Sequence, residues 1–279
     1  MKICLNWNTA GRGLALPEFV KLAKEAGFAG ADVDMKWAVE HGAAALRDLY
    51  GEHGMAFGGW GVGFDWRGDK TLAAEGLGIL DKQAKIAAEL GIDSCANHIL
   101  PSSELPFHQN WHFHLMRLMP IAKVLGGHGL RFGLEFVSPY DLRRKWKHEF
   151  VFTPMATLEL AEEVGENCGL LVDSFHLAAA GEPMSAVERI PVKRIGMVHI
   201  NDAIAGPIEG FQDSKRLLPG EGGIDLAGFV GGLKKIGYAG AVSLEVFSEE
   251  LKAMTAEGAA RRAARAVEEW SSRAVEGRR

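Results

Sequence analysis

Short apolar or β-branched runs alternate along the chain with longer segments whose apolar residues recur at helical spacing. The runs predict strands near residues 2–7, 30–35, 55–63, 91–97, 131–137, 169–174, 195–200 and 241–247. The intervening segments predict helices near 16–26, 40–52, 71–90, 108–128, 154–165, 184–189, 225–236 and 249–271. Eight strands that alternate with eight helices are typical of parallel βα units in an α/β protein.

Nothing in the pattern divides the chain into separate domains. It contains no linker rich in proline, serine or charge, and no GxGxxG phosphate loop follows a predicted strand. We therefore expect a single (β/α)8 TIM barrel over residues 1–270, in preference to an open doubly wound sheet. Residues 271–279 are polar, and we expect them to form a C-terminal tail that frays.

Composition limits the classes of partner. The chain has 279 residues, of which 47% are hydrophobic and 24% charged, which is ordinary for a globular protein with a large core. Its net charge of −5 and pI of about 6.1 argue against nucleic acid as a partner. No apolar stretch approaches the roughly 18 residues of a membrane span, and no signal peptide is visible. The sequence leaves open whether the protein forms a homo-oligomer.

The number and placement of the cysteines indicate a reducing compartment. Cys4, Cys95 and Cys168 are odd in number and far apart, and two of them lie in or beside apolar strands. Buried free thiols explain this arrangement better than a disulfide framework. We therefore expect a cytoplasmic protein.

Four of the apolar runs end in a residue that can bind a metal ion. The runs are Arg131–Phe136, Gly169–His176, Ile195–Ile200 and Ala241–Phe247, and the residues are Glu135, Asp173, His199 and Glu245. One such residue could be a solvated side chain at a strand end. Four in consecutive strands favour a shared site, because parallel strands gather their carboxyl ends on one face of a barrel. Carboxylates with one imidazole suit a divalent cation such as Mn²⁺, Mg²⁺ or Co²⁺.

These motifs resemble a known family over nearly the whole chain. The chain is similar to the xylose isomerase-like superfamily of sugar isomerases and epimerases, which includes ketose 3-epimerases, hydroxypyruvate isomerase and inosose-processing enzymes. The segments that carry the resemblance are Gly133–Phe136, Leu171–His176, Val198–Asp202, Leu218–Asp225 and Ser243–Glu245.

The resemblance implies an enzyme with one divalent metal ion, with Mn²⁺ preferred over Mg²⁺, Co²⁺ or Zn²⁺. It implies that Glu135, Asp173, His199 and Glu245 bind the metal. It also implies that Glu135 and Glu245 are the catalytic acid and base, and that His176 contacts a small sugar substrate. The expected reaction removes a proton next to a carbonyl and passes through a metal-bound enediolate.

Further substrate contacts are less specific. Family epimerases carry an arginine soon after the seventh-strand histidine; here the loop 203–219 is longer and its arginine, Arg216, could reach the site or lie on the surface. His98 follows the fourth predicted strand, and Trp60 lies near the end of the third, where an aromatic face can pack against a sugar. Asp202 follows His199 by three residues, and we expect it to accept a hydrogen bond from that imidazole.

Three other functions share this barrel. A keto-inositol dehydratase would use the same metal and would need an acid that expels a β-hydroxyl group. An endonuclease IV-like DNA repair enzyme would bind three metals and need more ligands, whereas His98 and His176 are the spare histidines at the strand ends. A non-catalytic sugar-binding protein would not need both Glu135 and Glu245. One bound metal ion would favour an isomerase or a dehydratase, three would favour the nuclease, and none after metal addition would favour the binding protein.

Overall fold

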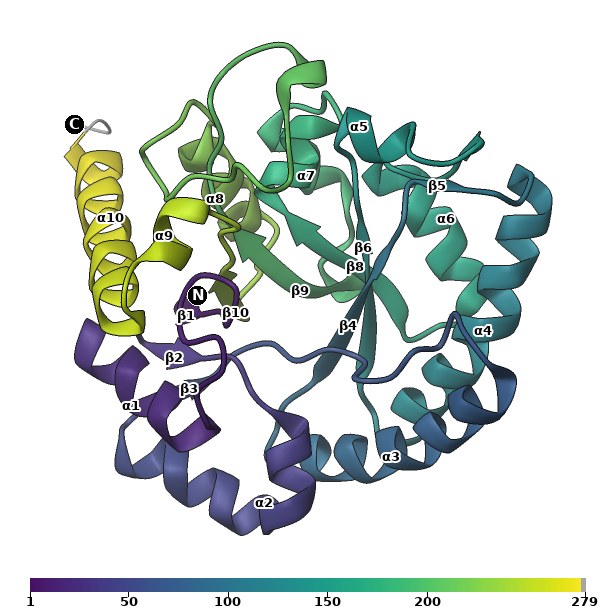
Figure 1. The fold of residues 1–279 in the computed structure, drawn as a ribbon, viewed down its shortest axis with the longest axis horizontal. Coiled ribbons are helices and arrows are strands. Elements are labelled where there is room, and N and C mark those ends of the chain that lie inside the picture. The colour runs from purple at the N-terminus through teal and green to yellow at the C-terminus, as the bar shows by residue number, and fades with distance from the viewer. Residues whose placement is uncertain (277–279) are drawn as a thin grey trace.

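Helices surround a single curled sheet of parallel strands in the computed structural model, which describes residues 1–276 (Figure 1). The strand order is β3-β2-β1-β10-β9-β8-β6-β4, and every neighbouring pair in this sheet is parallel. These strands are β1 (Lys2–Leu5), β2 (Gly30–Ala31), β3 (Ala56–Phe57), β4 (Ser94–Ile99), β6 (Arg131–Phe136), β8 (Cys168–Asp173), β9 (Ile195–Ile200) and β10 (Ala241–Leu244). The expected (β/α)8 TIM barrel is confirmed.

The two edges of the sheet meet through one short seam. Gly61 forms a parallel bridge with Ala96 of β4, where the amide of Val62 donates to the Ala96 carbonyl at 3.1 Å. The amide of Ala96 in turn donates to the Trp60 carbonyl at 3.1 Å. The segment that follows β3 thereby joins β4 and closes the circle of strands, which brings all carboxyl ends to one face.

The outer layer follows the predicted helical segments closely. Its longer helices are α1 (Leu16–Ala26), α2 (Met35–Glu52), α3 (Lys70–Glu89), α4 (Phe107–Gly127), α6 (Pro154–Val164), α8 (Leu226–Lys235) and α10 (Ala256–Glu276). Local sequence explains several ends: Asp34, Asp69 and Asp225 accept backbone amides as N-caps, and α1 ends at Gly27 with φ of 101°. No helix among residues 1–276 is long and apolar enough to cross a membrane.

Some boundaries differ from the expectation. The predicted helix 249–271 is two helices, α9 (Glu249–Ala253) and α10, because Met254 is extended and Thr255 accepts the amide of Gly258 as a new cap. Helix α10 continues to Glu276, beyond the expected end of the helix. Residues 184–189 form a 3-10 helix, η1 (Met184–Arg189), instead of an α-helix.

Several short elements were not expected. They are the antiparallel pair of strands β5 (Ser102–Ser103) and β7 (His148–Glu149), the helices α5 (Tyr140–Arg143) and α7 (Ser174–Ala179), and the 3-10 helices η2 (Val192–Arg194) and η3 (Ile208–Gly210). Two to six residues are too few to show a period in the sequence. All of them lie in connections between the barrel strands, and α7 directly follows β8.

Strands β2 and β3 contain only two residues each, against six or more expected. The side chain of buried Asp32 makes hydrogen bonds just beyond the ends of these short strands. Its Oδ1 accepts the Gly59 amide at 2.8 Å and the Ser243 hydroxyl at 2.5 Å. Its Oδ2 accepts the Asn6 amide side chain at 2.7 Å. A Cβ on Gly58 would lie 2.4 Å from Asp32 Oδ1, so this position requires glycine. Asp32 thus joins β1, β3 and β10 inside the barrel.

The core lies inside the barrel and beneath the helices. Strands β8 and β9 are buried at every position, as the continuous apolar runs predict. Ala96, Leu171 and Met197 form a small cluster of their own. Cys4, Cys95 and Cys168 are buried free thiols, as expected.

Candidate active site

The carboxyl ends of four adjacent strands bring Glu135, Asp173, His199 and Glu245 together. Glu135 lies in β6, Asp173 ends β8, His199 lies in β9 and Glu245 directly follows β10. Asp173 pairs with His199 in register, and His199 pairs with Ser243. One ligand atom from each of the four side chains lies within 4.8 Å of the other three.

The geometry of this cluster fits a divalent cation. His199 Nδ1 lies 3.2 Å from Glu245 Oε2, 3.6 Å from Glu135 Oε1 and 3.8 Å from Asp173 Oδ2. Glu135 Oε1 and His199 Nδ1 are buried, and neither has a hydrogen-bond partner among the described residues. Buried polar atoms without partners are costly, and three carboxylate oxygens with one imidazole nitrogen form a donor set suited to a hard or borderline cation. The cluster could therefore hold a metal ion.

Arg216 reaches into the cluster from the long loop 203–219 and does not lie on the surface. Its side chain is buried, and Nη1 donates to Asp173 Oδ2 at 2.9 Å and to Glu245 Oε2 at 3.0 Å. Its Nη2 donates to Asp213 Oδ1 at 2.7 Å. Burial alone would lower the pKa of Arg216, but these carboxylates raise it well above its usual range. Arg216 is therefore a permanent cation beside two of the candidate ligands.

His176 is packed behind Arg216. Asp173 Oδ1 accepts the backbone amides of Phe175 and His176, which begins α7 and places His176 beside the cluster. His176 Nε2 lies 3.1 Å from Arg216 Nη2 and 3.9 Å from Glu135 Oε1. The other ring nitrogen, Nδ1, accepts the Ser138 amide at 3.4 Å, so both ring nitrogens of His176 face donors of the protein. The imidazole is buried.

The charges of the site perturb one another strongly. Burial would raise the pKa of Glu245, but His199 and Arg216 hold that pKa well below its usual range. Burial likewise opposes ionisation of Asp173, and Arg216 lowers its pKa. Burial would lower the pKa of His199, whereas Glu245 and Glu135 raise it well above its usual value. The carboxylates of Glu245 and Asp173 are thus ionised at neutral pH, as metal ligation requires.

A cavity of about 320 Å³ opens beside the cluster on this face of the barrel. Glu135, His199 and Glu245 line it. Trp60 and His98 also line it, and Trp60 is buried with no partner for its indole Nε1 among the described residues. Partial burial and the charge of Arg67 lower the pKa of His98, so its imidazole is neutral at pH 7.

The expected hydrogen bond between Asp202 and the His199 imidazole was wrong. Asp202 does not bind that imidazole; its carboxylate accepts the amides of Ala203, Gly220, Gly222 and Ile224 at 2.8 to 3.1 Å. Asp202 therefore organises the two ends of the loop that carries Arg216. Its neighbour Asn201 has the role nearer the site, because its side-chain amide donates to Asp173 Oδ2 at 3.0 Å and to the Glu245 carbonyl at 3.0 Å.

Asn6, Asn8, Asp32 and Asn201 are the site residues that the sequence did not single out for chemistry. Asn8 donates from Nδ2 to Glu245 Oε1 at 2.8 Å, and Asn6 and Asp32 line the cavity. The available signal was position: Asn6, Asn8 and Asp32 follow the first two strands, and Asn201 follows the seventh. Each is a common turn residue, so the residue type alone did not point to the site.

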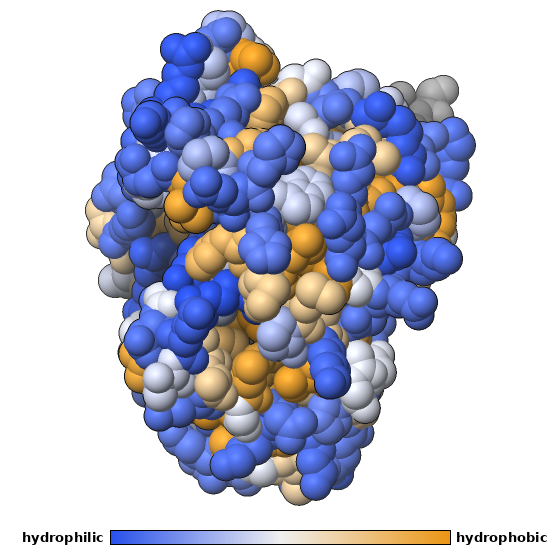
Figure 2. All heavy atoms as spheres, turned by 90° about the vertical axis from the view of Figure 1, so that its right-hand side faces the viewer, coloured by the Kyte–Doolittle hydropathy of each residue, from blue (hydrophilic) through white to orange (hydrophobic). Residues whose placement is uncertain are grey.

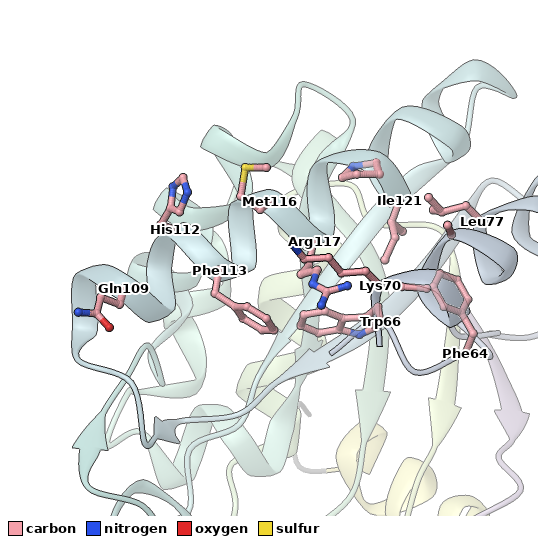
Figure 3. A pocket seen from close by; sticks show the side chains of 13 residues that line it. Phe64, Trp66, Lys70, Leu77, Gln109, His112, Phe113, Met116, Arg117 and Ile121 are labelled. Carbon is pink, nitrogen blue, oxygen red and sulfur yellow. The ribbon is translucent and has the colours of Figure 1, made fainter. Parts of the chain in front are cut away.

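A larger cavity of about 640 Å³ lies outside the barrel, between α3 and α4 (Figure 3). Phe64, Trp66, Phe113 and Met116 line it together with Arg117, whose Nη2 donates to the Gly68 carbonyl at 2.8 Å. Figure 2 shows the side of the molecule that is on the right in Figure 1, where apolar side chains lie among charged ones. None of the four candidate ligands lines this cavity, so we assign the candidate active site to the smaller one.

Comparison with known proteins identifies the family. The family model described as xylose isomerase-like TIM barrel matches residues 20–270, and the chain belongs to this family. The structure also resembles that of a xylose isomerase domain protein from Alicyclobacillus acidocaldarius, with a TM-score of 0.88 and 30% sequence identity. That match covers 98% of this chain and 99% of the other.

The relatives with named activities are enzymes. Inosose isomerase from Bacillus subtilis is 35% identical over 133 residues, which are 45% of this chain and 47% of that protein. L-ribulose 3-epimerase from Mesorhizobium japonicum is 26% identical over 188 residues, which are 66% of this chain and 58% of that protein. A 3-dehydroshikimate dehydratase from Pseudomonas aeruginosa is 36% identical over 139 residues, 49% of this chain and 21% of that protein. The matches thus span about half the length of the first two relatives and less of the third.

Proposed function

We propose that this protein is a metal-dependent isomerase or epimerase of a small sugar or keto-sugar. The observation that carries the proposal is the cluster of Glu135, Asp173, His199 and Glu245, with two buried ligand atoms that have no partner among the described residues. The similarity to inosose isomerase and L-ribulose 3-epimerase supports the same class of reaction.

The two glutamates divide the proton transfers. Glu135 and Glu245 come from strands on opposite sides of β8 and β9, so their carboxylates approach the cavity from different directions. One takes a proton from the carbon next to a carbonyl, and the other returns a proton to the opposite face or to the neighbouring carbon. A divalent cation held by the four ligands would polarise the carbonyl and stabilise negative charge on its oxygen. Such acid–base catalysis typically contributes about 10² to 10⁴ in rate.

The remaining site residues bind and orient the substrate in this proposal. Trp60 presents an aromatic wall, and His98 offers a neutral imidazole at the open side of the cavity. Arg216 balances the charge of Asp173 and Glu245, and His176 holds the guanidinium from behind. Neither His176 nor Arg216 lines the cavity, so the proposed contact between His176 and a sugar oxygen requires that Arg216 move aside.

The proposal includes Mn²⁺ as the preferred cation, because oxygen donors outnumber nitrogen three to one in the cluster. Zn²⁺ is the main competitor: the solved IOLI protein, which shares the fold at 23% identity and a TM-score of 0.78, carries a zinc atom. We further propose that the enzyme acts in the cytoplasm on free small molecules and that nucleic acid is not a partner.

A dehydratase is the second candidate, favoured by the match to 3-dehydroshikimate dehydratase. Removal of water also begins with abstraction of a proton next to a carbonyl, so the same glutamates would serve. It additionally needs a group that protonates the departing hydroxyl. The lowered pKa of His98 makes this imidazole a poor proton reservoir at neutral pH, which favours isomerisation.

The test is a panel of free ketoses, phosphorylated ketoses and inososes incubated in D₂O with the Mn²⁺-loaded protein. An isomerase or epimerase exchanges substrate hydrogen for deuterium and yields a product of unchanged composition. A dehydratase yields a product that lacks one water. Absence of both exchange and conversion across the panel, with metal content verified, would overturn the proposed function.

A further inference from the structure

The two carboxylate oxygens of Glu245 have different neighbours. Oε2 faces the metal-ligand cluster, 3.2 Å from His199 Nδ1 and 3.0 Å from Arg216 Nη1. Oε1 turns away from the cluster and accepts a hydrogen bond from Asn8 Nδ2 at 2.8 Å. In contrast, Glu135 Oε1 is buried without a hydrogen-bond partner among the described residues. The chain therefore fixes one particular oxygen of Glu245 outside the cluster.

Asn8 is itself held in place by the loop that follows β1. Its backbone amide donates to Asn6 Oδ1 at 2.7 Å, and Arg12 Nη2 donates to Asn8 Oδ1 at 2.6 Å. Both hydrogen-bonding groups of the Asn8 side chain are thus engaged, which selects a single orientation of the amide. Asn6 is anchored in turn, because its Nδ2 donates to Asp32 Oδ2 at 2.7 Å.

The same loop is fastened to the chain on both sides of Glu245. Thr9 Oγ1 donates to the Leu244 carbonyl at 2.6 Å and accepts the Val246 amide at 2.8 Å. Thr9 is buried, and β1 pairs with β10 in parallel up to Leu5 and Leu244. The distance from Asn8 to Glu245 is therefore set by a rigid connection and not by two independent side chains.

We propose that Asn8 is a positioning residue that aims Glu245 Oε1, the oxygen outside the cluster, at the substrate. The inference rests on the proposed function, in which Glu245 ligates the cation with one oxygen and exchanges a proton with the other. A carboxylate bound through one oxygen can still rotate about its terminal bond. The Asn8 amide removes this freedom before the substrate arrives, which is the preorganisation that proton transfer requires.

Asn8 differs from a residue that only stabilises the loop. The Thr9 and Asn6 contacts already connect the loop to β10 and Asp32 without the Asn8 side chain. Loss of the Asn8 amide group should therefore leave the fold and the cation-binding oxygen of Glu245 in place. The effect should fall on turnover, because misplacement of a reacting group by about 1 Å can cost about 100-fold in rate.

The experiment compares Asn8→Ala with Asn8→Asp, which keeps the shape and the acceptor for Arg12 but replaces the donor with an oxygen. Both variants should lose about 10- to 100-fold in kcat with KM changed by less than about 3-fold. Mn²⁺ content and the urea midpoint of unfolding should match those of the wild type. Crystal structures should show the Glu245 carboxylate rotated or in two orientations.

Three results would overturn the assignment. They are a kcat within about twofold of the wild type, a loss of bound Mn²⁺ or stability that parallels the loss of kcat, and an unchanged Glu245 carboxylate in the Asn8→Ala crystal. If the wild-type protein converts no substrate in the panel, the proposed function fails. The Glu245 orientation in the two crystals still decides whether Asn8 positions it.

Discussion

Replacement of Asp173 by alanine removes several interactions of one fully buried side chain. Asp173 Oδ1 accepts the Phe175 amide at 2.7 Å and caps α7, while Oδ2 accepts from Arg216 at 2.9 Å. Both oxygens also accept from Asn201 Nδ2. The same residue is a candidate metal ligand, so the substitution should reduce both stability and metal affinity.

The magnitude follows from these contacts. Loss of an N-cap typically costs about 1 kcal/mol. Loss of one partner of a buried ion pair typically costs about 3 to 5 kcal/mol, and the lower end applies here because Arg216 keeps Asp213 and Glu245. We therefore expect Asp173→Ala to lower the free energy of unfolding by about 4 kcal/mol. Asp173→Asn retains an acceptor for the cap and should lose about 1 kcal/mol less.

Asp173→Ala should lower metal affinity more than the substitution of a residue that only orients a metal ligand. Loss of such orienting residues typically weakens binding about 10- to 100-fold, so loss of the Asp173 carboxylate should weaken Mn²⁺ binding at least about 100-fold. The assays are urea unfolding of the metal-free protein, which avoids stabilisation by bound cation, and titration with Mn²⁺ followed by measurement of bound metal.

Asp225→Ala is the matched control. Asp225 caps α8 through the Gly228 amide at 2.8 Å, but it is exposed and remote from the cluster. This variant should lose about 1 kcal/mol and bind Mn²⁺ as the wild type does. The reasoning is refuted if Asp173→Ala behaves like Asp225→Ala in both assays.

Four further predictions follow from the site. Glu135→Gln and Glu245→Gln should fold and bind metal but lose turnover. One of the two variants could still exchange substrate hydrogen for solvent deuterium, because the surviving glutamate can remove and return the same proton. Full activity in both variants would mean that other residues transfer the protons. His176→Ala should retain metal and lose kcat/KM, whereas loss of metal with full recovery on re-addition would make His176 a structural residue. Mn²⁺ binding at pH 7 should release a proton from His199, because the pKa of this imidazole is raised well above its usual value. Calorimetry in buffers of different ionisation enthalpy should detect the released proton. Binding without proton release would contradict the assignment of His199 as a ligand. Burial raises the pKa of Asp32 from 3.8 to about 6, so Asp32 loses its proton at a lower pH in the unfolded chain than in the folded protein. The free energy of unfolding, measured relative to that of Asp32→Asn, should therefore fall by about 3 kcal/mol as the pH rises from below 4 to above 6. A difference between the two proteins that does not change with pH would refute this.

The sequence alone determined the barrel and the four clustered side chains. Parallel strands in a closed barrel are buried on both faces, so each strand appears as an apolar run that ends where the chain reaches the active-site face. Glu135, Asp173, His199 and Glu245 interrupt four such runs at similar depth. Their proximity follows from strand order and pairing, which the alternating pattern specifies without knowledge of any side-chain contact.

Tertiary structure decided what surrounds that cluster. Asn8 and Glu245 are separated by 237 positions, and Asp32 and Ser243 by 211, so their hydrogen bonds exist only after the barrel closes. Arg216 could be a surface charge or a site residue in the sequence, and it is buried because the Asp202 carboxylate orders the loop that carries it. Periodicity describes repeated burial along regular elements, whereas loops have no period, and their paths are fixed by long-range polar contacts.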